Sequence, residues 1–379
     1  MSDEIRPFRI EVGDDVLSDL RRRLVATRWP EKETVADWSQ GIPLAYVQEL
    51  CAYWRDEYDW RTAEARLNAH PGFLIRIDGV DIHFLHVRSP EANARPLVLT
   101  HGWPGSIVEF LKVIGPLSDP AAHGGDPADA FHLVVPSLPG YGFSGKPAES
   151  GWSVDRIGRA WSELMLRLGY DGYFAQGGDW GAVVTISIGA SDTRHCAGIH
   201  TNMPVVSPAG TPPEELTEFE KASLESQKFY ADWDSGYSKQ QSTRPQTLGY
   251  GLADSPSGQA AWIVEKFYQW TDCGGHPENV LTRDELLDNV MLYWIPDAAA
   301  SSARLYWESF RGGNIDPVTL PSGCSIFPKE IFRASRRWVE TRFTDLRYYN
   351  ALDKGGHFAA FEQPEIFVEE VRACFRTMR

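Results

Sequence analysis

The stretch that most constrains the fold of this chain runs from residue 173 to residue 188. The apolar run Tyr173–Ala175 predicts a short buried strand, and Ala182–Ile188 predicts a helix soon after it. Between them lies Gly177-Gly178-Asp179-Trp180-Gly181, whose small residues let a strand and a helix approach closely and tolerate a strained turn. Such a strand–turn–helix lifts the side chain at its apex, here Asp179, out at the end of the strand.

The identity of the apex residue is chemically informative. In the G-x-S-x-G pattern of such turns the apex is a serine nucleophile, whereas this chain has Asp179 there. A carboxylate in this place can attack carbon and form an ester with the protein. A purely structural explanation competes, because aspartate is also a favoured N-cap of a following helix. The rest of the chain has to decide between the two.

Bulk composition excludes several classes of protein. The 379 residues suit one large α/β domain with insertions. A formal charge of −15 disfavours nucleic acid or an anionic membrane surface as partner. Five cysteines without a CxxC motif fit a reducing, intracellular setting. The acidic N-terminus and the lack of any apolar run of eighteen residues predict a soluble, cytoplasmic protein without signal peptide or membrane anchor.

Residues 1–72 are expected to form an arm rather than a domain. Ile5–Ile10 has the pattern of a short extended piece, and Asp14–Thr27 that of an amphipathic helix. A second helix is predicted over Pro43–Tyr58. Because two helices bury too little surface to be stable alone, we expect them to pack on the main body.

Residues 73–204 and 311–379 carry the pattern of an α/β core. Strands are predicted at residues 73–77, 80–87, 97–100, 131–135, 173–175, 197–201, 324–327 and 346–349. The first two flank Asp78-Gly79 and predict a β-hairpin. The others alternate with helical stretches, which predicts an eight-stranded, mostly parallel sheet with helices on both faces and ligands at the carboxyl ends of the strands. The helical, Trp- and Tyr-rich segment 205–310 is expected to be a lid over those ends.

A hydrolase that forms an ester intermediate needs a histidine base after its nucleophile. The candidates that follow the Asp179 turn are His195, His200, His276 and His357. His357 stands out because it follows two glycines after the last predicted strand and precedes the closing helix.

The acid that orients the base should lie at the end of an intervening strand. Glu330 fits, since it follows the strand that ends at Phe327, and it is favoured. Two rivals remain: Asp345 precedes its strand, and Asp353 shares a loop with His357. A glutamate at this place is also explained by the start of a helix.

Hydrolysis of an ester also requires donors for an oxyanion. The backbone N–H groups of Trp103 and Trp180 are expected to supply them, one from the His101-Gly102-Trp103-Pro104 loop and one after the apex aspartate. If the leaving group is an epoxide oxygen, neutral tyrosine hydroxyls on the lid are suitable proton donors. A halide would instead need Trp or Asn N–H groups. The lid tyrosines are Tyr230, Tyr237, Tyr250, Tyr268, Tyr293 and Tyr306, and composition does not choose among them.

These motifs together resemble a known family. His101-Gly102-Trp103-Pro104-Gly105-Ser106, Gly178-Asp179-Trp180-Gly181 and the run from Gly355 to Glu362 are similar to the epoxide hydrolases of the α/β-hydrolase fold. The N-terminal stretch Ile5–Pro30 and the lid runs 244–247, 254–256 and 265–267 resemble the microsomal-type branch. The resemblance covers nearly the whole chain. It departs from the mammalian members in having no membrane anchor, which implies a soluble bacterial enzyme.

The resemblance implies a role for five residues. Asp179 matches the nucleophile, His357 the base and Glu330 the acid, while Tyr237 and Tyr306 match the two lid tyrosines that hold the epoxide oxygen. The implied reaction converts an epoxide and water to a vicinal diol through an aspartyl ester, with no metal and no cofactor.

Five lid tryptophans indicate a bulky or aryl epoxide, and a biosynthetic intermediate of secondary metabolism is one source of such a substrate; they are Trp233, Trp262, Trp270, Trp294 and Trp307. A homodimer is the expected assembly. Two alternatives stay open. A haloalkane or haloacid dehalogenase shares the aspartate and histidine, and a non-catalytic ligand-binding protein shares the fold.

Overall fold

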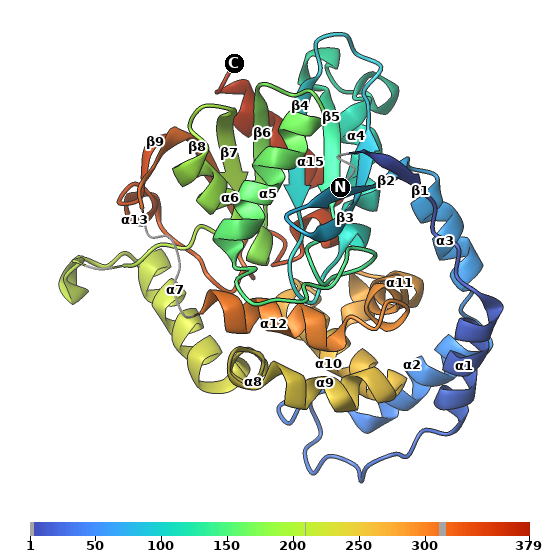
Figure 1. Ribbon diagram of the computed structural model, residues 1–379. Coiled ribbons are helices and arrows are strands. Elements are labelled where there is room, and N and C mark those ends of the chain that lie inside the picture. The colour runs from blue at the N-terminus through green and yellow to red at the C-terminus, as the bar shows by residue number, and fades with distance from the viewer. Residues whose placement is uncertain (1–3, 209, 311–315) are drawn as a thin grey trace.

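The computed structural model describes residues 4–208, 210–310 and 316–379. Its centre is one sheet with the strand order β1-β2-β3-β5-β4-β6-β7-β8-β9 (Figure 1). The strands are β1 (Arg6–Phe8), β2 (Gly72–Ile77), β3 (Val80–Val87), β4 (Arg95–Thr100), β5 (Phe131–Pro136), β6 (Tyr173–Gly177), β7 (Cys196–Thr201), β8 (Val318–Ile326) and β9 (Phe343–Ala351). From β5 to β9 all neighbours are parallel, so the predicted mostly parallel sheet is confirmed.

The strand count differs from the prediction. The described residues form nine strands rather than eight, because Arg6–Phe8 pairs antiparallel with β2 at the edge of the sheet, Pro7 opposite Phe73. An edge strand of three residues has one neighbour and no alternating burial, so the sequence predicts only a short extended piece over Ile5–Ile10 and not a strand of the sheet. The hairpin was predicted correctly: Asp78 and Gly79 both have positive φ, of 49° and 85°.

Helices cover both faces of the sheet (Figure 1). α5 (Val154–Arg167) and α6 (Asp179–Ser191) pack together on one face, and α4 (Leu111–Ser118) and α15 (Pro364–Arg376) on the other. The short helices α13 (Arg336–Val339) and α14 (Ala359–Glu362) follow β8 and β9. Central strands are buried on both sides, as the fully buried Leu97, Val98 and Leu99 of β4 show.

The segment between β7 and β8 is helical, as predicted. Its elements are α7 (Glu218–Phe229), a π-helical turn (Tyr230–Asp234), α8 (Gly236–Thr243), α9 (Pro245–Asp254), α10 (Pro256–Trp270), α11 (Arg283–Trp294) and α12 (Ala299–Ser309). They gather below the sheet in Figure 1, at the end where β4 and β6 finish. Short 3-10 helices lie at Ile107–Phe110, Ala121–His123, Pro127–Asp129, Pro213–Glu215 and Pro277–Asn279.

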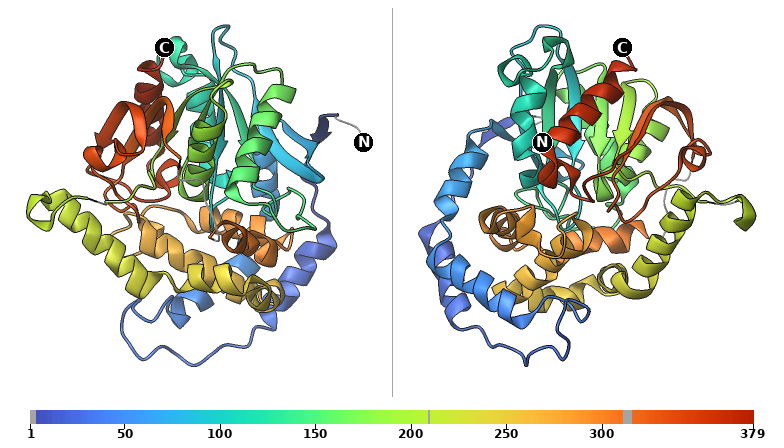
Figure 2. Two further views of the ribbon diagram at one scale, coloured as in Figure 1. Left: turned by 60° about the vertical axis from the view of Figure 1, so that its left-hand side comes forward. Right: turned by 180° about the vertical axis from the view of Figure 1, so that it is seen from behind.

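The N-terminal residues form three helices: α1 (Asp14–Val25), α2 (Leu44–Asp56) and α3 (Trp60–Asn68). The sequence analysis missed α3, which starts at Asp59, whose side chain accepts from the Arg61 N–H. Figure 2 shows these blue helices running down one side of the molecule and beneath the yellow and orange helices. Contacts join α1 and α2 to α10, and Tyr58 donates to the buried Asp288 of α11. The N-terminal residues therefore contact both the helical segment, through α1, α2 and Tyr58, and the sheet, through β1.

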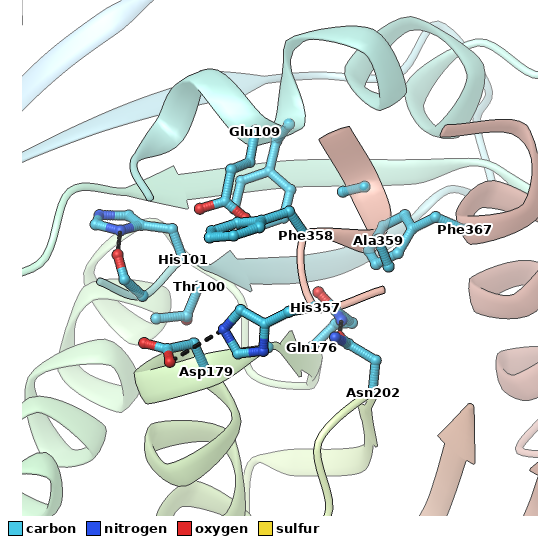
Figure 3. A pocket seen from close by; sticks show the side chains of 14 residues that line it. Thr100, His101, Glu109, Gln176, Asp179, Asn202, His357, Phe358, Ala359 and Phe367 are labelled. Atoms are coloured by element: carbon cyan, nitrogen blue, oxygen red, sulfur yellow. Dashed lines mark hydrogen bonds and ion pairs between the residues drawn. The ribbon is translucent and has the colours of Figure 1, made fainter. Parts of the chain in front are cut away.

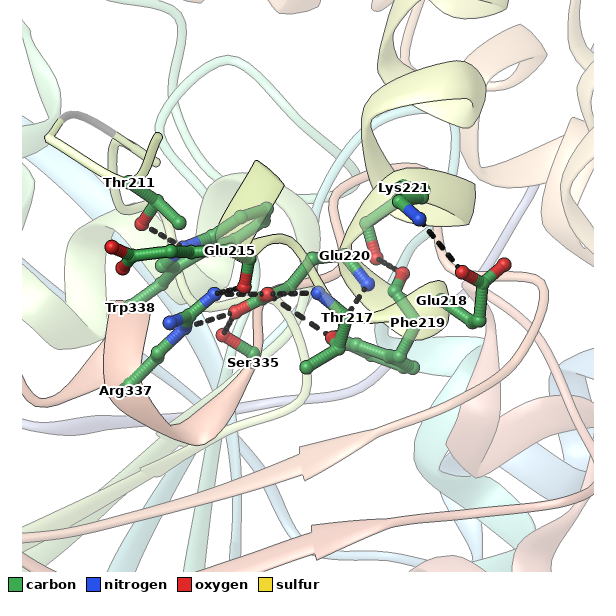
Figure 4. Close-up of polar contacts among 11 residues, drawn as sticks. Thr211, Glu215, Thr217, Glu218, Phe219, Glu220, Lys221, Ser335, Arg337 and Trp338 are labelled. Atoms are coloured by element: carbon green, nitrogen blue, oxygen red, sulfur yellow. Dashed lines mark hydrogen bonds and ion pairs between the residues drawn. The ribbon is translucent and has the colours of Figure 1, made fainter. Parts of the chain in front are cut away.

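A polar cluster ties α7 to the core (Figure 4). Glu220 on α7 is fully buried and accepts from Arg337 Nε at 2.6 Å and from Ser335 Oγ at 2.6 Å. It also completes a capping box with Thr217. The Arg337 guanidinium lowers the pKa of Glu220 to about 2, although burial acts in the opposite direction. Hydrogen bonds from Ser335 and Thr217 add smaller effects of the same sign as Arg337.

In the described residues we find no helix that combines the length and apolar character needed to cross a membrane.

Candidate active site

The turn between β6 and α6 is as tight as its glycines predict. Asp179 has a φ of 51°, in the left-handed region that a non-glycine residue adopts only under constraint. A Cβ at Gly181 would lie 1.9 Å from the Thr100 carbonyl oxygen, so β4 and α6 touch through backbone alone. The N-cap residue of α6 is Gly178, and the Asp179 side chain bonds outside its own helix. The helix-capping explanation of Asp179 is therefore wrong.

The loop after β4 holds the Asp179 carboxylate. The Trp103 N–H donates to Asp179 Oδ1 at 2.7 Å, and a Cβ at Gly102 would lie 2.0 Å from that oxygen. His101 fixes the loop, since its ring nitrogens bond to Gly102 O and to the Leu138 N–H. Burial lowers the pKa of His101 to about 4, so it stays neutral in this role. Trp180 is the second residue of α6, where helix N–H groups lack intrahelical acceptors.

His357 bridges two carboxylates, and Figure 3 shows the contact with one of them, Asp179. Its Nε2 lies 3.2 Å from Asp179 Oδ2, and its Nδ1 lies 2.6 Å from Glu330 Oε1. The backbone N–H of His357 donates to the Trp270 carbonyl. This bond anchors the His357 loop to α10. Burial alone lowers the pKa of His357, but the charges and hydrogen bonds of Glu330 and Asp179 together outweigh it and raise the pKa well above its ordinary value.

Glu330 lies in the loop after β8 and is 1% exposed. A bridge between Lys329 and Gly356 brings this loop beside that of His357, and the Ile331 N–H donates to Glu330 Oε1. The two rivals lie elsewhere: Asp345 sits within β9 and pairs with Arg347 at the surface, and Asp353 is exposed.

The remaining histidine candidates have other contacts. They bond to Ser325 (His200), to the Asp171 carbonyl (His195) and to the Glu278 N–H (His276).

Tyr237 and Tyr306, from the helical segment between β7 and β8, line one cavity together with Asp179. The Tyr237 ring stacks on Trp103 with centroids 4.8 Å apart, and Tyr306 meets Trp180 edge-on at 4.8 Å. Burial, together with nearby charges including Asp179, raises the pKa of both hydroxyls well above the ordinary value, so both stay protonated. The Tyr306 hydroxyl is buried and has no partner with hydrogen-bonding geometry among the described residues.

The other four tyrosines of the segment divide into one cavity residue, one exposed residue and two with structural contacts. Tyr230 lines the same cavity, and its hydroxyl lies 2.9 Å from that of Tyr237. The others are exposed (Tyr250), stacked on Trp38 (Tyr268) or bonded to the Gly105 carbonyl (Tyr293). Sequence reasoning listed Tyr230 but gave it no role, because the π-helical turn that points it inward has no recognisable pattern.

The carboxylate and the tyrosines open onto a cavity of about 810 Å³. Its wall is largely aromatic and apolar, and includes Trp180, Tyr230, Phe310 and Phe332. None of the five lid tryptophans of the sequence analysis is among the described residues that line it. Trp270 is instead buried against His357, and Trp233 is 81% exposed. Those tryptophans therefore carry no information about the substrate. The described residues also contain no cluster of His, Cys, Asp and Glu suited to a metal ion.

Comparison with known proteins decides the family. A family model described as "Epoxide hydrolase N terminus" matches residues 5–110, and one for the alpha/beta hydrolase fold matches residues 95–243. Epoxide hydrolase 1 of Sus scrofa is 35% identical over 400 residues, covering 98% of this chain and 88% of that protein. The chain belongs to the epoxide hydrolase family. A protein of Stigmatella aurantiaca that carries a provisional epoxide hydrolase name is 56% identical, over 99% of this chain and 86% of its own length.

Solved epoxide hydrolases share the whole architecture. The juvenile hormone epoxide hydrolase of Bombyx mori superposes with a TM-score of 0.91 at 30% identity, covering 100% of this chain and 95% of that one. The Aspergillus niger epoxide hydrolase gives 0.90 at 32% identity, over 99% and 97%. This epoxide hydrolase therefore has the microsomal-type arrangement, with the N-terminal region ahead of the α/β-hydrolase core, as its motifs predicted.

Proposed function

We propose that this epoxide hydrolase converts a bulky or aryl epoxide to a vicinal diol through an ester on Asp179. The observation that carries the proposal is the placing of one carboxylate between a histidine and two protonated tyrosines, with Asp179 and both tyrosines on one cavity wall. A carboxylate can attack a ring carbon while neutral hydroxyls donate to the oxygen that leaves it.

Ring opening is the first step. Trp103 N–H binds Asp179 Oδ1, which leaves Oδ2 to attack one ring carbon. The carbon–oxygen bond of the ring breaks, and its electron pair stays on the epoxide oxygen, which receives a proton through Tyr237 or Tyr306. The product is a hydroxyalkyl ester of Asp179.

Ester hydrolysis is the second step. Esterification removes the Asp179 charge and thereby one of the causes that raise the pKa of His357. The imidazole then releases its proton, which replaces the one that the tyrosine gave to the epoxide oxygen, and becomes the base that activates water, held by Glu330 at Nδ1. Water adds to Cγ of Asp179, the Trp103 N–H stabilises the oxyanion, and the ester bond breaks to give the diol.

The cavity supports a substrate larger than a simple alkyl epoxide. A volume of about 810 Å³ is in the range of roughly 300–1,000 Å³ that holds drug-sized ligands. Aromatic walls from Trp180, Phe310 and Phe332 suit an aryl group or a fused ring system, which a biosynthetic epoxide could also supply. The helices of residues 205–310 act as a lid, and residues 1–72 as an arm on the core formed by residues 73–204 and 311–379.

The test is a single turnover of styrene oxide in oxygen-18 water with enzyme in excess. An unlabelled diol in the first turnover means that its new oxygen came from Asp179, as we expect. Label entering the diol at once would mean that water opens the ring directly. Asp179→Ala should abolish turnover, and His357→Gln should retain the ester as a mass increase equal to the substrate. Chloride release from an alkyl chloride, without diol from any epoxide, would identify a dehalogenase.

A further inference from the structure

A second, much smaller cavity lies against the catalytic groups. It measures about 20 Å³ and is bordered by Glu109, Asp179 and His357 (Figure 3). A site of roughly 10–15 Å³ on this measure holds one water molecule if two to four polar partners surround it. Gln176 and Asn202, which bond to each other, add further polar groups to the wall. The cavity has the size and the lining of a site for a single water.

Glu109 is the acidic residue of this wall that has no role in the two reaction steps. It is 9% exposed, and a Cβ at Gly105 would lie 1.5 Å from its Oε1, so the missing side chain at 105 makes room for the carboxyl. Burial raises the pKa of Glu109 to about 8. The charge of His357 and, to a smaller extent, the Ser106 backbone N–H act against burial, while the charge of Asp179 adds to it. An uncharged carboxyl still offers a carbonyl oxygen as an acceptor.

We propose that Glu109 positions the hydrolytic water between itself and His357 for cleavage of the Asp179 ester. The inference rests on the proposed ester mechanism and adds a residue to its second step.

A water in the small cavity would lie beside Glu109, His357 and Asp179, which all line it. The water donates one hydrogen to His357 Nε2 and the other to the Glu109 carboxyl, so that a lone pair faces Cγ of Asp179. As the new oxygen–carbon bond forms, the proton passes to Nε2 and the negative charge goes to the oxygen held by Trp103 N–H. Collapse breaks the bond from Cγ to the substrate oxygen, and the departing alkoxide takes the proton back from His357. A neutral Glu109 adds no second negative charge beside the oxyanion.

A structural role for Glu109 must be separated from this one. Ser106 begins the 3-10 helix Ile107–Phe110 and its Oγ accepts from the Val108 N–H, so Glu109 stands where a capping box has its glutamate. Loss of a cap lowers the stability of the protein but does not change the ratio of the two chemical rates.

The experiment compares Glu109→Leu and Glu109→Gln with the parent. Leucine nearly fills the same space without a polar atom, whereas glutamine keeps both the carbonyl acceptor and the bond to Ser106 N–H. Styrene oxide is mixed with excess enzyme, the reaction is quenched in acid, and intact mass records the ester against time. In Glu109→Leu the ester should form within about twofold of the parent rate and hydrolyse about tenfold or more slowly. Glu109→Gln should hydrolyse within about threefold of the parent.

The outcomes separate this inference from the proposed function. Ester hydrolysis at the parent rate in Glu109→Leu, an equal loss in both steps, or a glutamine variant as slow as the leucine variant would each overturn the role of Glu109 while the ester mechanism stands. Absence of any ester in His357→Gln would overturn the proposed function itself. Should Glu109→Leu not fold, Glu109→Met gives the same comparison with an unbranched apolar side chain.

Discussion

The hydroxyl oxygens of Tyr230 and Tyr237 lie 2.9 Å apart on the wall of the large cavity. Each hydroxyl has one proton, so only one of the two can donate in this contact. Once Tyr237 turns its single proton to a substrate oxygen, Tyr230 can donate to Tyr237 across the same contact. The same bond then stabilises the phenolate character that Tyr237 gains as it gives up its proton.

Tyr230→Phe should therefore slow ring opening without affecting ester hydrolysis. We expect a loss of about five- to tenfold in the rate of ester formation, the size of one ordinary hydrogen bond. Stopped-flow tryptophan fluorescence or quenched intact mass measures the step. Tyr250→Phe is the matched control, because Tyr250 is a lid tyrosine that is 71% exposed. Equal rates of ester formation in Tyr230→Phe and Tyr250→Phe would show that Tyr230 does not assist Tyr237.

Tyr306→Phe should trade activity for stability. Tyr306 lines the large cavity, and its hydroxyl has no hydrogen-bond partner with good geometry in the described part of the chain, so removing it breaks no hydrogen bond within the protein. Removing it should leave the free energy of unfolding unchanged or raise it, while ester formation slows. Tyr237→Phe also loses a hydrogen bond to Tyr230, so it should slow the reaction without any gain in stability. Urea unfolding of both variants, beside their single-turnover rates, checks the contrast; a clear loss of stability in Tyr306→Phe would contradict it.

The sequence predicted the parts of this protein that local pattern encodes. The turn at Asp179, the Asp78-Gly79 hairpin and the parallel strands all have short-range signals, and the structure has them where expected. Glu330 could be favoured because its place after β8 follows from strand order alone.

Other features depend on contacts between distant residues. β1 forms through its pairing with β2. The five tryptophans of segment 205–310 were predicted to line the substrate cavity, but none is among the described residues that line it. The sequence analysis gave Glu109 no role. Only the fold shows that Glu109, His357 and Asp179 line the same small cavity.

A buried ion pair should make Lys266 essential for stability. Lys266 Nζ lies 2.6 Å from Asp234 Oδ1, each side chain is 7% exposed, and Trp270 Nε1 donates to the other Asp234 oxygen. Lys266→Met leaves a buried carboxylate without its cation, and such a loss costs about 3–5 kcal/mol. Chemical denaturation measures it.

The control for that prediction is the exposed pair of Lys228 and Asp232 in the same segment. Lys228→Met should cost no more than about 0.3–0.5 kcal/mol, since Lys228 is 76% exposed at its side chain. Similar losses of unfolding free energy in the two lysine variants would show that the buried pair stabilises the protein no more than the exposed pair.

The contact between Glu220 and Arg337 should stabilise the packing of α7 on the core at neutral pH and lose this effect in acid. The folded state lowers the pKa of Glu220 from 4.5 to about 2, chiefly through the Arg337 guanidinium. A group with a lowered pKa contributes stability that is fully present above its unfolded pKa and is lost as the pH falls toward the folded value. The advantage of the parent over Glu220→Gln in unfolding free energy should therefore shrink between about pH 5 and about pH 2. Glu218→Gln, on the same helix with a 91% exposed side chain, should show little pH-dependent difference from the parent. An advantage over Glu220→Gln that stays constant across this range would mean that the carboxylate charge of Glu220 does not hold α7 to the core.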